Sequence, residues 1–125
     1  VHIGLFCSTP MVALSRNLGN KHAMEMLLTG DMVSASRAAE MGLVNQVVPS
    51  NELRAASMAM AGKIAAKSSL TVATGKRAFY QQKEMDLAAA YDYASKIMVD
   101  NMLARDAEEG IAAFIEKRAP DWRDE

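Results

Sequence analysis

Residues 23–30 read AMEMLLTG and begin the pattern that decides the fold. Their apolar residues recur at three- and four-residue spacing, which predicts an amphipathic helix that begins near Asn20 and ends at Thr29-Gly30. The apolar side chains on one face of this helix are Ala23, Met24, Leu27 and Leu28. Downstream, Ser34 is a suitable cap for a two-turn helix over residues 35–41, which Gly42 would end.

Two short segments on either side of this helix pair have strand composition. Residues 43–48 read LVNQVV between Gly42 and Pro49, and residues 1–6 read VHIGLF, as if a buried strand were entered in mid-element. Two isolated strands bury little surface, so we expect partner strands outside this sequence. Until such partners cover them, both segments should expose apolar side chains.

The remaining chain predicts a mostly helical protein. A first helix should start at Ser8-Thr9-Pro10 and end near Leu18, with Gly19 as its left-handed cap. From Ser50 onward, the expected helices cover about 50–65, 70–84, 86–102 and 106–118. Asp106 and Glu109 have the spacing of a capping box. Lys117 and Arg118 should lie in the final turn, with Pro120 as the stop and Trp122 as a packed anchor.

Composition excludes several classes of function. The formal net charge is −1, so the chain has no basic excess for nucleic acid or an anionic membrane. No apolar run approaches the ~20 residues that span a bilayer. A single cysteine, Cys7, excludes an internal disulfide and is expected to be a buried or semi-buried thiol. His2 and His22 have no clustered acids, so we assign no metal site.

Three segments in a fixed order resemble the crotonase (enoyl-CoA hydratase/isomerase) superfamily. Residues 23–30 are similar to its A-x-E-x-x-L-T-G, and residues 34–49 to its S-A-x-x-A-x-x-x-G-L-V-x-x-V-V-P. Residues 106–118 resemble its terminal D-x-x-E-G-x-x-A-F-x-E-K-R. Residues 4–10, GLFCSTP, are similar to an enoyl-CoA hydratase domain-containing branch. The resemblance covers essentially the whole chain and places it in the C-terminal half of the family pattern.

The resemblance implies a fold and a division of the chain. The family has an α/β spiral of ββα units (the ClpP/crotonase-like fold), followed by helices that assemble trimers, often paired into hexamers. Residues 1–49 would then be the end of the spiral core, as strand-helix-helix-strand. Residues 50–125 would be the C-terminal helical trimerisation region. The chain is therefore expected to be mostly α on its own.

The resemblance also implies acyl-CoA chemistry. Family members hold the thioester carbonyl in an oxyanion hole of two backbone N–H groups, which stabilises an enolate-like charge. Hydratases add two glutamates as acid and base. In the family pattern all of these groups precede Val1, so we assign no catalytic residue here and expect this segment alone to be inactive. Hydration of an enoyl-CoA leads, with isomerisation, hydrolysis or decarboxylation as alternatives.

Five residues match family positions that contact substrate. Phe114 and Lys117 match positions at which the C-terminal helix reaches coenzyme A, an aromatic face meeting the adenine or pantetheine and an ammonium meeting phosphate. Gly4, Leu5 and Phe6 match the border of the acyl pocket. The bland alternatives are a core phenylalanine, a solvated lysine and a buried strand followed by a turn. No cofactor is expected beyond the coenzyme A of the substrate.

Other functions stay open at this stage. A non-catalytic helical assembly module that completes a partner chain is one alternative, and a methionine-rich peptide binder is another. For the enzyme, the expected partners are an acyl-CoA thioester, the missing N-terminal half, and further copies in a trimer or hexamer. Nucleic acid and membrane are not expected. The expected compartment is the cytoplasm, or the mitochondrial matrix in a eukaryote.

Overall fold

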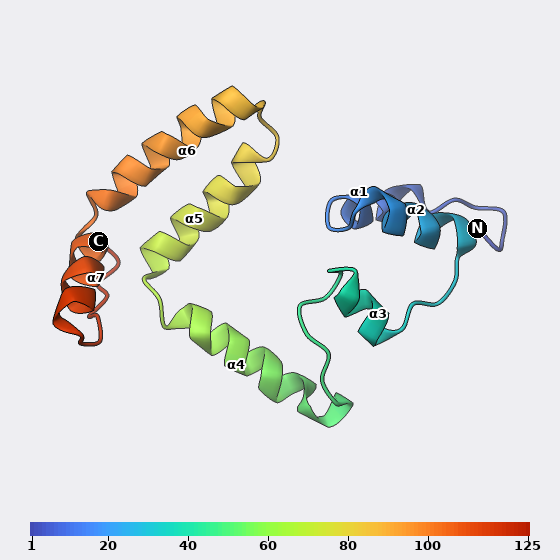
Figure 1. Ribbon diagram of the computed structural model, residues 1–125, viewed down its shortest axis with the longest axis horizontal. Helices are drawn as coiled ribbons and strands as arrows, with labels where there is room; N and C mark the ends of the chain where they lie inside the picture. The colour runs from blue at the N-terminus through green and yellow to red at the C-terminus, as the bar shows by residue number, and fades with distance from the viewer. The chain divides into compact units, whose positions relative to one another are not determined.

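The computed structural model describes all 125 residues as seven α-helices and one short 3₁₀ turn, with no β-strand (Figure 1). This result confirms that the chain is mostly α. The helices are α1 (Ser8–Ser15), α2 (Asn20–Thr29), α3 (Ala35–Glu40), α4 (Leu53–Ala65), α5 (Ser69–Gln82), α6 (Leu87–Met102) and α7 (Arg105–Glu116), and the 3₁₀ turn is η1 (Ser50–Glu52). They form two compact units, Val1–Leu53 and Arg54–Glu125.

The first unit is built on the pair α1 and α2, which pack side by side (Figure 1). Its buried apolar residues are Leu18, Ala23, Leu27 and Ala38. Gly30 ends α2 with a left-handed φ of 69°, as the sequence predicted, and its N–H donates to Met26 O at 3.1 Å. The Ser34 hydroxyl accepts the Arg37 N–H at 3.2 Å and caps α3, which also confirms the prediction.

The second unit contains an antiparallel hairpin of α5 and α6 (Figure 1). Each of its helices starts at a side-chain cap: Ser68 accepts the Thr71 N–H at 3.1 Å, and Asp86 accepts the Ala89 N–H at 2.9 Å. The Tyr93 hydroxyl donates to the Gln81 amide oxygen across the hairpin. Helix α7 packs against α6. Its Ala113 is 1% exposed, so α7 approaches its neighbours through a small side chain.

Neither expected strand forms. Residues 1–6 make a turn and an irregular segment, and residues 43–48 are bends and coil. A β-strand needs a neighbouring strand to accept its N–H groups and supply its carbonyl partners, and this chain contains none. The expected exposure of apolar side chains is confirmed: Ile3, Leu5, Phe6, Val44 and Val47 all lie open to solvent.

Helix α1 begins at Ser8 as predicted, but its N-cap, its C-terminal end and the end of α7 differ from the prediction. Ser8 and Thr9 do not cap α1, whose N-cap is Cys7, because the Ser8 hydroxyl donates to Phe6 O instead. Helix α1 ends at Ser15, and Gly19 has extended geometry and serves as the N-cap of α2. Helix α7 ends at Glu116, upstream of Pro120.

The expected capping box at the start of α7 does not form either. Ala104 is the N-cap, and Asp106 lies inside the first turn. Its carboxylate accepts the N–H groups of Arg123 and Asp124, so it holds the C-terminal tail rather than its own helix. A sequence pattern shows which carboxylates lie near the start of a helix. It does not show whether their hydrogen bonds come from that helix or from a donor far away in the sequence.

Candidate functional site

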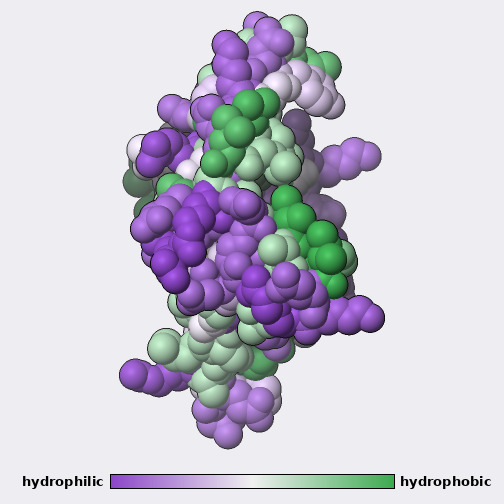
Figure 2. Space-filling model, turned by 90° about the vertical axis from the view of Figure 1, so that its left-hand side faces the viewer, coloured by the Kyte–Doolittle hydropathy of each residue, from purple (hydrophilic) through white to green (hydrophobic).

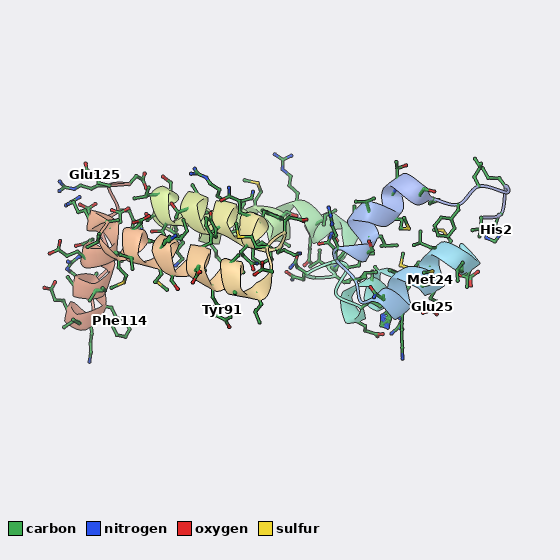
Figure 3. The ribbon with its side chains drawn as sticks, turned by 90° about the horizontal axis from the view of Figure 1, so that it is seen from above. His2, Met24, Glu25, Tyr91, Phe114 and Glu125 are labelled. Atoms are coloured by element: carbon green, nitrogen blue, oxygen red, sulfur yellow. The ribbon has the colours of Figure 1, made fainter.

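The end of α7 brings two of the predicted residues together. Phe114 is 84% exposed and projects from the α7 ribbon (Figure 3). Lys117 is the C-cap, with a left-handed φ of 55°, and its N–H donates to Phe114 O at 3.3 Å. Arg118 N–H donates to Ala113 O at 3.0 Å and closes the same turn. The buried alternative for Phe114 is therefore wrong within this chain, and both side chains are free to meet a ligand.

The other three predicted residues lie in the first unit, in the irregular segment before α1. Gly4 has a left-handed φ of 75°, and its N–H donates to Val1 O at 2.9 Å in a tight turn. Leu5 and Phe6 follow with exposed side chains. The buried-strand alternative for this segment is thus also wrong in this chain. Because the strand itself is unformed, the assignment of these residues to an acyl pocket stays a prediction.

A largely apolar groove of about 550 Å³ lies between α5, α6, α7 and the tail. Phe114 stands on one side of it, and Trp122 contributes from the tail. Other side chains that line it are Lys67, Val72, Met98, Met102 and Ile111. Local sequence patterns do not predict this groove, although the apolar stripe through Met98 and Met102 and the Trp122 anchor both contribute to its walls.

Helices α6 and α7 carry many exposed apolar side chains, some of them in this groove and the others outside it. Figure 2 shows hydrophobic residues in the open among polar ones on the side where α6 and α7 lie. The large exposed apolar side chains of these two helices are Leu87, Tyr91, Met98, Val99, Met102, Ile111, Phe114 and Ile115. A surface of this kind marks an interaction site.

A bidentate ion pair fixes the C-terminal turn of α7. Arg118 donates to both carboxylate oxygens of Glu109, at 2.6 and 2.9 Å, and to Glu116 at 2.6 Å. The Arg118 side chain and the Asp121 N–H hold the pKa of Glu109 at about 2, well below its ordinary 4.5. The two carboxylates raise the pKa of Arg118, so its charge is permanent. This network orients the chain directly after Lys117.

Asp106 is the most buried charged side chain of the second unit, at 2% exposure. The Arg123 N–H, at 2.9 Å, is the main cause of its lowered pKa, with help from the Ser68 hydroxyl and the Asp124 N–H at 3.0 Å. Burial opposes this shift, because it disfavours the charged form. Three donors thus keep a buried carboxylate ionised in a structural position.

The structure also shows where the remaining histidine, cysteine and carboxylate candidates lie. No three histidine, cysteine or carboxylate side chains come together as metal ligands. Cys7 is exposed, against the expectation of a buried or semi-buried thiol, because the segment around it is uncovered. Glu25 lies on α2 (Figure 3) and lines a groove of about 300 Å³ with Asp31 and Arg37. No helix is long and apolar enough to cross a membrane.

Comparison with known proteins decides the family. Residues 1–125, the whole chain, match the model of the family described as "Enoyl-CoA hydratase/isomerase". The chain belongs to this family. It is the C-terminal, helical part of the crotonase fold and is similar to members of the enoyl-CoA hydratase domain-containing branch, which confirms both the resemblance and the fold class.

Individual relatives agree with this assignment. The mouse (Mus musculus) enoyl-CoA hydratase domain-containing protein 3, mitochondrial, is 51% identical over 122 residues, which are 98% of this chain and 41% of that protein. A crystal structure of enoyl-CoA hydratase from Mycobacterium smegmatis has a TM-score of 0.91 at 52% identity, covering 97% of this chain and 47% of that one. The human domain-containing protein 3 structure has a TM-score of 0.88 at 50% identity, covering 97% and 48%.

The chain therefore spans less than half the length of the relatives that it matches. The strand-like segments without partner strands agree with this result, because a family member of full length has further chain to pair with them.

Proposed function

We propose that this chain is the substrate-gripping C-terminal part of an acyl-CoA-processing enzyme, in which Phe114 and Lys117 hold coenzyme A. One observation carries the proposal: at the end of α7 an aromatic face and an ammonium group stand exposed within one turn, and Phe114 opens onto an apolar groove. An ammonium suits a phosphate, and the ring suits adenine or the pantetheine arm. Family membership supports a thioester substrate.

The remaining chemistry belongs to the complete protein. We propose an oxyanion hole of backbone N–H groups that stabilises the enolate of the thioester, with hydration of an enoyl-CoA as the leading reaction. Isomerisation, hydrolysis and decarboxylation use the same oxyanion hole with other acids and bases. Gly4, Leu5 and Phe6 would border the acyl chain once a partner strand orders their segment. The 125-residue segment alone is proposed to be inactive and to need no cofactor.

A matched pair of substrates tests the role of Lys117. In the complete protein, Lys117→Met should raise KM for an acyl-CoA by about ten- to 150-fold, since a lost charge-assisted contact to phosphate weakens binding by about 1.5–3 kcal/mol. KM for the N-acetylcysteamine thioester, which lacks the nucleotide, should stay unchanged. Phe114→Ala should act in the same direction on the acyl-CoA.

Lys63→Met is the control, because Lys63 is an exposed lysine of α4 outside the groove. It should leave KM for both substrates at the wild-type value. Equal losses on the two thioesters for Lys117→Met would contradict the coenzyme A contact. Detecting no turnover of enoyl-CoA, acyl-CoA hydrolysis or decarboxylation with the complete protein would favour the alternative, a non-catalytic assembly module.

We also propose assembly into a trimer or hexamer through the uncovered faces of α6 and α7. Support comes from the exposed apolar side chains that these helices carry, including Tyr91, Val99 and Ile115 (Figure 3 shows Tyr91 projecting from α6). Such a surface is typical of a contact between subunits. Native mass spectrometry of the complete protein should give three or six copies, and a monomer would contradict the proposal.

The location of the protein follows from its source. The mouse and human relatives are named as mitochondrial proteins. We propose the mitochondrial matrix for a eukaryotic protein of this kind and the cytoplasm for a bacterial one. In a eukaryotic source, cell fractionation with an antibody against residues 50–125 should find the protein in the mitochondrial fraction, and its recovery in the cytosol would contradict this proposal.

A further inference from the structure

The C-terminal tail, residues 120–125, makes a dense set of bonds although it has no regular structure. Its N–H groups at Arg123 and Asp124 donate to the two oxygens of Asp106, at 2.9 and 3.0 Å. In return, Asp106 N–H donates to Glu125 O at 3.0 Å. The exchange joins the tail to the first turn of α7 at a buried position.

A second carboxylate, Asp124, belongs to the tail itself and binds backbone amides of α5. Asp124 Oδ1 accepts the Ser69 N–H at 2.7 Å and the Leu70 N–H at 3.4 Å, the first amides of α5. These amides have no partner within their own helix, and the helix dipole favours an anion there. Asp124 reaches them in a left-handed conformation, φ 62°, which an aspartate tolerates better than most residues. The tail therefore caps α5 from 54 residues away.

The indole of Trp122 makes the third attachment. Its N–H donates to Ala66 O at 3.0 Å, at the corner between α4 and α5. Its ring lies over Gly110 of α7 so closely that a Cβ at that position would stand 3.1 Å from it. Trp122 is also part of the groove on which Phe114 opens.

We infer that residues 120–125 form a strap that fixes the start of α7 to the corner between α4 and α5 and holds Trp122 as a wall of the groove. The strap is one cooperative unit, since Asp106 holds the strap amides and the strap's own Asp124 holds the α5 amides. Releasing either end must therefore free the other. This inference concerns a part of the fold only and does not depend on which reaction the complete protein carries out.

Hydrogen exchange in the natural protein that carries this chain tests the cooperativity. Asp106 accepts no bond from the Ser69 or Leu70 amides, so faster exchange of these two amides in Asp106→Asn reports release of the strap. Asp106 also contacts the Ser68 hydroxyl, which caps α5, so the Thr71 amide is followed in the same variant to detect a direct effect through Ser68. We expect these two amides to exchange about five- to thirtyfold faster in this variant, the factor for a loss of one or two hydrogen bonds. Asp124→Asn should likewise accelerate exchange of the Arg123 amide and the Trp122 indole N–H.

Two internal references make the result specific. The Thr71 amide is bonded to Ser68 Oγ within α5 and should exchange at the wild-type rate in Asp124→Asn. Asp121→Asn is the matched control, because this carboxylate belongs to the same strap, is 78% exposed and makes only a loose 3.6 Å pair with Arg123. It should change neither end.

The result that overturns the inference is acceleration confined to the amides that each mutated carboxylate contacts. Two separate local contacts would give that pattern. If Asp106→Asn impairs folding, the exposed Asp124→Asn decides the question alone through the Trp122 indole, which Asp124 does not touch. A wild-type exchange rate there would refute the strap.

Discussion

The two irregular ends of the chain differ in how their polar groups and apolar side chains are accommodated. In the opening segment, residues 1–7, the Gly4 N–H bonds locally to Val1 O, and Ile3 is 83% exposed. In the closing segment, residues 119–125, the Asp121 N–H donates to Glu109 of α7, and two further N–H groups, at 123 and 124, donate to Asp106. One end is apolar and uncovered, and the other is polar and tied down.

Polar and strand-like segments need different partners in order to be ordered. A polar tail can be ordered by a few charged side chains of its own unit, because each carboxylate accepts several N–H donors at once. A strand-like segment requires a partner strand along its whole length and a covering layer for its apolar face. The closing segment finds its partners within this chain, and the opening segment does not.

The largest expected effect comes from truncating Ile3 in the complete protein. If a partner strand and a covering layer bury it there, Ile3→Ala should lower the free energy of unfolding by about 2–5 kcal/mol, the usual cost of a truncated core residue. In the 125-residue chain, where Ile3 is exposed, the same change should cost less than about 0.5 kcal/mol. Denaturant melts of both forms measure the contrast.

Met32→Ala provides the reference for this experiment. Met32 lies in the same unit and is 98% exposed, so its truncation reports the cost of changing an uncovered apolar residue. A small effect of Ile3→Ala in the complete protein, equal to that of Met32→Ala, would mean that the opening segment stays uncovered. The absence of a partner strand would then not explain why the opening segment is less ordered than the closing one.

Acid should release the closing segment and leave the opening one unchanged. The pKa values of Glu109, Asp106 and Asp124 lie below their ordinary values, Glu109 at about 2 because of Arg118. A depressed folded pKa stabilises the native state above the ordinary pKa, near 4 to 4.5, and this contribution is lost as the pH falls toward the folded value. The Trp122 indole N–H signal should therefore shift between about pH 4.5 and 2.

The charges around these carboxylates set the controls for that titration. Arg118 and Arg105 lower the pKa of Glu109, and Arg118 also pairs with Glu116. Arg105 lowers the pKa of Asp106 as well, and the charge of Asp106 raises that of Asp124. Arg118→Gln removes the main cause of the Glu109 shift and should move the transition to higher pH. A transition that does not move in Arg118→Gln would show that another group controls the strap.

A double-mutant cycle at Gly110 and Trp122 should show a coupling of about 1–2 kcal/mol. Alanine at Gly110 gains about 1 kcal/mol of helix propensity, but its Cβ would stand 3.1 and 3.3 Å from ring atoms of Trp122 and displace the indole. Gly110→Ala should therefore destabilise the protein that has Trp122 and stabilise the Trp122→Ala variant. Thermal melts give both signs, and additive changes would exclude the close contact.

Helix positions could be predicted well from the sequence because they depend on local patterns. The spacing of Ala23 and Leu27 and the caps Gly30 and Ser34 act within a few residues, and the structure agrees with all of them. The strand over residues 43–48 could not be predicted reliably, since β-branched residues favour a strand only where a neighbour accepts its hydrogen bonds. The strand-like composition of residues 43–48 did indicate that partner strands lie outside this chain.

In the candidate site too, local features could be predicted and long-range contacts could not. The exposed pair of Phe114 and Lys117 followed from matching a family motif, and their placement in one turn follows from helix periodicity. The binding of coenzyme A by this pair stays a prediction. The prediction that Asp106 belongs to a capping box was wrong. Its partners, Arg123 and Asp124, lie 17 and 18 residues away, beyond the reach of any local pattern. Contacts across such a distance depend on how the tail folds back, which spacing does not encode.

The smallest expected effect separates the backbone of Lys117 from its side chain. Lys117 lies in the left-handed region, with φ 55°. This conformation destabilises a residue with a Cβ by about 1 kcal/mol, whereas glycine adopts it without strain. Lys117→Gly should therefore raise the free energy of unfolding by up to about 1 kcal/mol, while Lys117→Met should leave it nearly unchanged. Both variants lack the ammonium group, so both should weaken acyl-CoA binding equally. A glycine variant that is more stable yet binds less well would show that the lysine is kept for its charge and not for the helix end.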